Sequence, residues 1–123
     1  MKMLRKTKSI LIAAQDLRLA GLIEEYLSTS GYDVLCEFNL DAALERLMRT
    51  AIDLVIVDGE MPRRVFKNFV ETAAKVRPGV PVIAVGLSDR EEETRSLSNF
   101  VKAFVEKPFG ISDISNVVNA NLN

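Results

Sequence analysis

Two charged side chains stand at the ends of apolar runs, and they are the residues with which this chain could do chemistry. Asp58 ends one run and Lys107 follows another. In an open parallel sheet, ligands bind outside the carboxyl ends of the strands, so these two charges are expected in one shallow pocket. Ala14 and Gln15 follow the first apolar run at the same level, where further carboxylates would have completed a metal site. The pocket therefore offers one carboxylate and one ammonium group in place of an acidic cluster, and we expect Asp58 and Lys107 to form a salt bridge.

Composition narrows the function classes. The chain has 123 residues, a formal net charge of −1 and no histidine. This length suits one domain, and the near-neutral charge gives no basic patch of the kind that binds nucleic acid. The absence of histidine removes the commonest general base and zinc ligand, together with Ser-His-Asp and Cys-His catalytic arrangements. We expect a domain that is not an enzyme and does not bind nucleic acid.

The start of the chain is basic but short. Residues 1–8 are predicted to form a basic extension before a single domain over 9–123. The apolar stretch that follows stops at Gln15, which makes it too short for the hydrophobic region of a signal peptide. We expect a cytoplasmic protein without membrane association. The single cysteine, Cys36, allows no internal disulfide and is expected to pack within a strand.

Apolar runs of strand length alternate with segments of helical period, which predicts βαβ units around a parallel sheet. The predicted strands cover residues 9–14, 33–37, 52–57, 81–85 and 103–106. The predicted helices cover 17–28, a segment capped by Asn39 that runs through Leu47, 65–76, 89–98 and 111–122. The third strand is apolar on both faces, which is typical of a central strand covered by helices on both sides.

Residues that favour helix ends bound these segments. Gly31 tolerates positive φ and is expected to end the first helix. Ser88 with Glu91 three residues later forms a capping box, which opens the helix at 89–98. That helix is nearly all polar, so we expect it to pack weakly.

The strand that ends in Asp58, the pair Met61-Pro62 and the late run 107–109 (Lys-Pro-Phe) resemble the receiver domain of two-component response regulators. The likeness covers essentially the whole chain. It implies an α/β fold of the (βα)5 type, a doubly wound CheY-like (flavodoxin-like) sandwich with a parallel five-stranded sheet in the order 2-1-3-4-5. It also implies that Asp58 accepts a phosphoryl group from a histidine kinase in a phosphorelay.

The same resemblance marks departures from the family pattern. Family members hold Mg²⁺ with an acidic pair after the first strand, and Ala14 and Gln15 stand at those positions. They bond the phosphoryl group with a Ser or Thr after the fourth strand, which is Gly86 here, and pair it with the lysine that matches Lys107. Phe104 matches the aromatic residue of the fifth strand that turns inward when the hydroxyl moves. The resemblance thus implies a degenerate pocket with a disconnected switch.

The electrostatic attraction for Mg²⁺ that is lost with the acidic pair can be estimated. Removing one carboxylate about 4–5 Å from the ion gives up on the order of 3–4 kcal/mol of attraction at an effective dielectric of about 20. Two such losses disfavour Mg²⁺, and no other cofactor is expected. Asp58 and Glu60 remain as weak metal ligands at a site that we expect to be unoccupied. Glu60 is alternatively a solvated loop residue, and Asp16 is expected to cap a helix.

Three functions stay open. The first is an atypical, phosphorylation-independent receiver, a protein-interaction or dimerisation module whose face comprises the fourth helix, fifth strand and fifth helix. Its partner is a histidine kinase, an output domain or a second copy, and Phe104 on the more exposed side of its strand would mark that face. The second keeps Asp58 as a working phosphoacceptor, assisted by Glu60 or Asp16. The third, a flavodoxin-like cofactor binder or small enzyme, needs a phosphate cradle that residues 14–17 do not provide.

Overall fold

A parallel sheet covered by helices on both faces forms the domain. The structure is a computed structural model that describes residues 7–86, 97, 99–106 and 109–122. The strands are β1 (Ser9–Ala13), β2 (Asp33–Glu37), β3 (Leu54–Asp58), β4 (Val82–Val85) and β5 (Ala103–Val105). The described helices are α1 (Leu17–Thr29), α2 (Leu40–Arg49), α3 (Arg63–Val76) and α5 (Ile111–Leu122).

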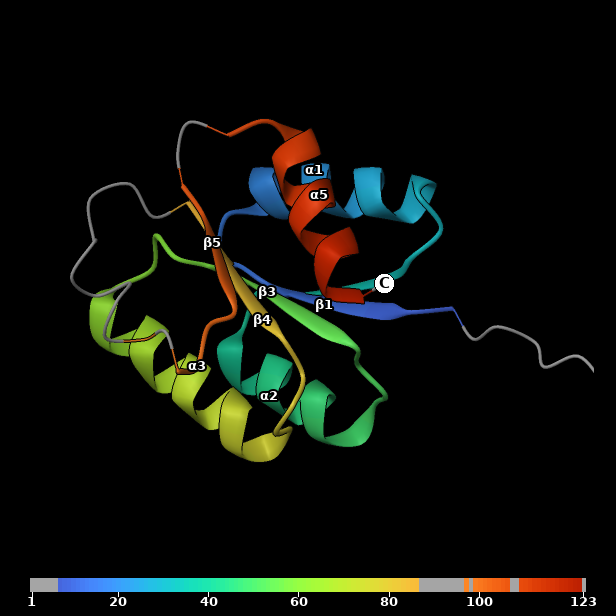
Figure 1. The fold of residues 1–123 in the computed structure, drawn as a ribbon. Coiled ribbons are helices and arrows are strands. Elements are labelled where there is room, and N and C mark those ends of the chain that lie inside the picture. The colour runs from blue at the N-terminus through green and yellow to red at the C-terminus, as the bar shows by residue number, and fades with distance from the viewer. Residues whose placement is uncertain (1–6, 87–96, 98, 107–108, 123) are drawn as a thin grey trace, which may run out of the picture.

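The five strands lie in the order β2-β1-β3-β4-β5, with every neighbouring pair parallel. Helices α1 and α5 cover one face of the sheet, and α2 and α3 cover the other (Figure 1). The predicted doubly wound α/β class and its strand order are confirmed. Apart from Leu97, the helix predicted over 89–98 lies outside the described residues, as does its Ser88 and Glu91 capping box.

Alternation along each strand divides the core into two layers. Odd-numbered positions of β3, such as Val55 and Val57, join the layer beneath α2 and α3. Even-numbered positions, such as Leu54 and Ile56, join the layer beneath α1 and α5. All five residues of β3 are buried because helices cover both of its faces. The two-sided apolar pattern of this segment therefore predicted a central strand correctly.

Local hydrogen bonds explain where the helices begin and end. The Asp16 carboxylate accepts the N–H groups of Arg18 and Leu19 at 3.0 and 3.2 Å, and Asn39 Oδ1 accepts the N–H of Ala42 at 3.0 Å. Gly31 follows α1 with φ +100°, a conformation that glycine adopts without strain. These three predicted helix ends are confirmed. Helix α3 starts two residues earlier than predicted.

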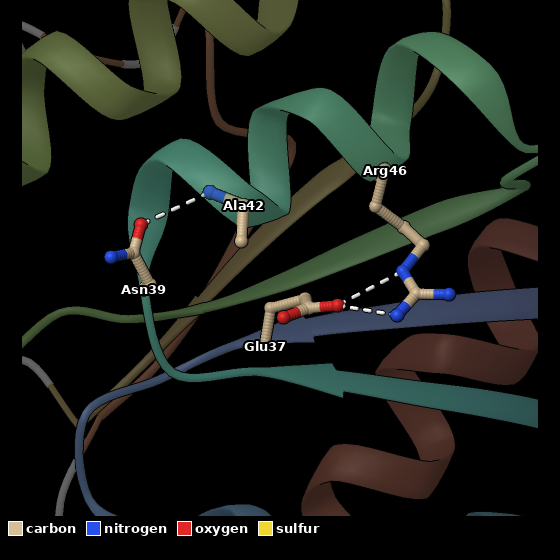
Figure 2. A network of polar contacts seen from close by, with 4 residues as sticks. All are labelled: Glu37, Asn39, Ala42 and Arg46. Atoms are coloured by element: carbon tan, nitrogen blue, oxygen red, sulfur yellow. Dashed lines mark hydrogen bonds and ion pairs between the residues drawn. The ribbon is translucent and has the colours of Figure 1, made fainter.

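An ion pair connects the edge strand β2 to helix α2. Glu37, the last residue of β2, accepts hydrogen bonds from Nε and Nη2 of Arg46 on α2, at 3.0 and 2.5 Å (Figure 2). The same view shows Asn39 at the start of α2 with its bond to Ala42. One acidic side chain from the carboxyl edge of the sheet is therefore engaged with α2.

Side-chain exposure corrects one prediction. Phe104 lies on the α2 and α3 side of β5, whereas Ala103 and Val105 lie on the α1 and α5 side, as the alternation predicted. Phe104 is half-buried rather than exposed because it packs against the buried cluster of that layer.

Within the described ranges, no helix has the length and apolar character needed to span a bilayer.

Helix α1 contains a glycine at a position where the structure has room for a larger residue. Gly21 lies within α1, and a Cβ added to it would meet no heavy atom within 4 Å. We expect Gly21→Ala to raise the free energy of unfolding by about 0.5–1 kcal/mol, since alanine loses less backbone entropy in a helix. Urea titration followed by circular dichroism measures this change. Gly31→Ala is the matched control and should lower stability, because its φ is +100°; an increase in that variant would contradict the backbone assignment.

The thiol of Cys36 should react slowly. Burial, followed by the Glu24 and Glu37 carboxylates, raises the pKa of Cys36 from 9.0 to about 12. Deprotonation grows with pH, so the thiolate stays scarce in the folded protein until the solution is strongly alkaline. Ellman's reagent at pH 8 should modify the native protein at least about tenfold more slowly than the protein in guanidinium chloride. Equal rates in the two states would show that the thiol is not shielded.

Candidate phosphoacceptor site

Asp58 lies at the carboxyl end of β3 and is buried, with only 4% of its surface exposed. Its Oδ1 accepts the backbone N–H of Glu60 at 2.9 Å, and the N–H of Gly59 donates to the carbonyl of Val85 at 2.8 Å. These bonds turn the chain after β3 and hold the carboxylate at the edge of the sheet. Asp58 is the sole buried charged side chain within the part of the chain that the structure describes.

The end of β1 delivers no acid to this carboxylate. Ala13 pairs with Val57 in parallel register, so the next residue, Ala14, stands at the level of Asp58. Ala14 is 2% exposed, and its N–H donates to the carbonyl of Glu37 at 3.2 Å. The strand alignment used for the sequence is thus confirmed here, and a methyl group occupies the position beside Asp58. Gln15, the next residue, is exposed.

Other nearby carboxylates have their own roles. Asp16 caps α1, as predicted, and Glu37 pairs with Arg46. Glu60 is exposed, and its backbone N–H bonds to Asp58. Among the described residues, no group of three histidine, cysteine, aspartate or glutamate side chains could hold a metal ion.

A divalent cation therefore fits this edge poorly. Mg²⁺ demands near-ideal octahedral geometry and is usually held by one or two carboxylates together with waters and substrate phosphates. In the described residues Asp58 is the carboxylate buried at the edge, and the neighbouring strand contributes the methyl group of Ala14 instead of a second acid. The assignment of Glu60 as a weak ligand stays a prediction.

Gly86 occupies the position where the family has a hydroxyl residue, and its backbone suits glycine. It is buried after β4, and its N–H donates to the carbonyl of Val105 at 2.9 Å. Its φ is +93°, in the left-handed region where a residue with a Cβ is strained. The absence of a hydroxyl is therefore matched by a backbone conformation that disfavours Ser or Thr.

Lys107 lies outside the described residues, so its pairing with Asp58 stays a prediction. The segment beside it is described. Phe109 is half-buried and packs against the layer beneath α1 and α5.

A groove of about 410 Å³ opens between β5 and α5. Its lining comprises Phe104, Val105, Glu106, Phe109, Asp113, Asn116 and Val117. The sequence predicted this face but not Val117, which lies beside the inward stripe of α5 that includes Ile114 and Val118. Two adjacent valines in one turn of that helix were the available signal.

Exposed apolar side chains near the carboxyl edge were also missed. Leu17 begins α1 and is 63% exposed, and Phe38 follows β2 and is 48% exposed. Leu17 stands directly after the cap residue Asp16 and outside the buried stripe of α1, which was its only sequence signal.

The likeness to known proteins matches this geometry. The family model described as "Response regulator receiver domain" matches residues 10–119. A curated relative, the transcriptional regulatory protein CrdR of Helicobacter pylori, is 26% identical over 112 residues, which cover 87% of this chain and 51% of that protein. The chain thus spans about half the length of that relative.

Solved structures show the same fold. A CheY-like response regulator receiver domain protein from Methanospirillum hungatei superposes with a TM-score of 0.84 and 25% identity, over 95% of this chain and 94% of the other. The chemotaxis protein CheY4 of Vibrio cholerae superposes with a TM-score of 0.83 at 17% identity, over 95% and 100% of the two chains. From the family match over residues 10–119 and this shared architecture, the chain belongs to the response regulator receiver domain family of two-component signalling.

Proposed function

We propose that this receiver domain acts without phosphorylation, as a docking module of the cytoplasm that is not itself an enzyme. The observation that carries the proposal is the buried methyl group of Ala14 at the level of Asp58. Phosphoryl transfer depends on metal ions and cationic groups that neutralise charge in the transition state. With Asp16 and Glu37 engaged elsewhere, the described edge supplies too little negative charge to recruit that metal.

The backbone at Gly86 supports the same proposal. A phosphoryl group on Asp58 would be read through a hydroxyl after β4, and Gly86 carries none. Its φ of +93° fits glycine, so this position is adapted to its present residue. We therefore propose that Phe104 does not act as a switch residue in this chain and serves to pack β5 against the α2 and α3 layer.

The groove between β5 and α5 is the surface that we propose for docking. Phe104 and Phe109 line it, together with the acidic residues Glu106 and Asp113. A second copy using the same groove would bring like charges together, because an isologous interface pairs a patch with itself. The acidic rim instead favours a partner domain with basic and apolar side chains, such as an output domain or a histidine kinase.

One alternative keeps Asp58 as a working phosphoacceptor. The observation in its favour is the placement of the Asp58 carboxylate at the strand end, oriented by the N–H of Glu60 at 2.9 Å. A metal would then have to be held with help from Glu60 or from the phosphodonor itself. A chemical test separates this alternative from the docking proposal.

A phosphodonor experiment tests the first proposal. The protein is incubated with acetyl phosphate and Mg²⁺, and its intact mass is measured. We expect no mass increase, because the end of β1 places the methyl group of Ala14, and not a second acid, at the level of Asp58. Asp58→Asn is the matched control and should likewise show no gain of mass on incubation. A gain of one phosphoryl group that disappears in Asp58→Asn would establish the phosphoacceptor function instead.

A charge change in the groove tests the docking surface. Asn116 is exposed and lines the groove, so Asn116→Arg should leave the fold intact and repel a basic partner. We expect a partner isolated from the source cells to bind the purified variant at least about tenfold more weakly, measured by calorimetry. Leu22→Arg adds the same charge on α1, where Leu22 is 57% exposed, and should bind as the unsubstituted chain does. An equal loss of affinity in both variants would show that the groove is not part of the interface.

A further inference from the structure

A second concave site lies at the opposite edge of the sheet from Asp58. It encloses about 430 Å³ between the end of α3, the start of β4 and the segment that leads into β5. This volume falls within the range of small-molecule sites, roughly 300–1,000 Å³. The side chains that give the cavity its chemistry are Arg77, Lys102, Asn99, Asn121, Val80 and Phe100.

The charge of this cavity is one-sided. Arg77 and Lys102 line it, and no carboxylate side chain is among its described lining residues. The ion pairs of the described structure join Arg46 to Glu37 and Arg49 to Glu45, so neither cation of the cavity takes part in one. Two cations that line one concave surface, with no ion-pair partner among the described residues, attract anions.

The guanidinium of Arg77 is already positioned. Arg77 is half-buried, its backbone N–H donates to Ala73 at 2.9 Å, and its Nη2 donates to the carbonyl of Thr50 at 3.1 Å. Guanidinium carries five N–H donors, so this bond leaves others for a ligand. Lys102 is fixed at its backbone, where its N–H donates to Val82 at 2.8 Å. A ligand therefore has to order less of the Arg77 side chain than it would for an unrestrained arginine.

The surroundings of the cavity add an apolar contact for a ligand and also a partial negative charge that opposes an anion. Val80 and Phe100 are half-buried and give the cavity an apolar side that suits an organic body rather than a bare inorganic ion. Helix α3 ends at Val76 beside the cavity, and the partial negative charge of its carbonyl end opposes an anion. That partial charge is about half an elementary charge, which is smaller than the two full side-chain charges.

We propose that this cavity binds a small organic anion that carries a carboxylate or a phosphate group. Arg77 would hold the anionic group in a forked hydrogen-bonded pair, Lys102 would add a second charge, and Phe100 would contact the organic part. The site shares no residue with the edge that carries Asp58 or with the groove lined by Val117. Its existence is therefore independent of the function proposed above.

Nuclear magnetic resonance titration of the full chain tests this site. Succinate and adenosine monophosphate serve as carboxylate and phosphate probes, added at constant ionic strength to about 10 mM. We expect saturable shifts of the backbone amides of Val80, Phe100 and Lys102 with at least one probe, and the stronger probe identifies the anionic group. The amides of Asp58 and Val117 should not move.

Two substitutions make the test specific. Lys102→Gln leaves the backbone bond to Val82 in place, and Arg77→Gln removes the guanidinium; each should weaken binding at least about tenfold. Lys67→Gln removes an exposed cation of α3 that does not line the cavity, and should bind as the unsubstituted chain does. Absence of saturable shifts with both probes overturns the proposal, as does equal weakening in Lys67→Gln. Should Arg77→Gln fail to fold, the comparison of Lys102→Gln with Lys67→Gln decides alone.

Discussion

The parallel pairing of β1 with β3 is the constraint on which the rest of the structure depends. The strand order reverses here, because β1 pairs with β2 on one side and with β3 on the other. Helices α1 and α5 cover one face and α2 and α3 the other, so both strands are buried on both faces (Figure 1). The register places Ala14 at the level of Asp58 and thereby decides which side chains share the edge where this fold binds ligands.

Because of this register, the residue type at position 14 determines the charge beside Asp58. A carboxylate beside Asp58 would make the edge strongly negative, and the methyl group of Ala14 leaves it with one buried charge. The acids that the described chain does hold nearby serve structure, since Asp16 begins α1 and Glu37 ties β2 to Arg46. The described edge therefore combines the receiver fold of the family with one buried carboxylate, Asp58.

Most of the fold could be predicted from the sequence, because the informative residues act locally. The two-sided apolar pattern of β3 and the caps at Asp16 and Asn39 depend on near neighbours, and all three are confirmed. Val117 and Phe104 were less predictable, because their burial depends on which surfaces meet across the sheet. The cavity at Arg77 gave no sequence signal, since its residues come from three separated segments. The acid-poor edge was predictable only because strand alignment set Ala14 beside Asp58.

The left-handed backbone at Gly86 has a consequence for substitutions toward the family pattern. A Ser or Thr at this position would place a Cβ on a residue with φ +93°, at a cost of about 1–2 kcal/mol unless the loop rearranged as well. An acid at position 14 would likewise replace a methyl group that is packed in the core. The backbone at Gly86 and the packed methyl group of Ala14 are therefore two separate obstacles to installing the family's hydroxyl and acid by single substitutions.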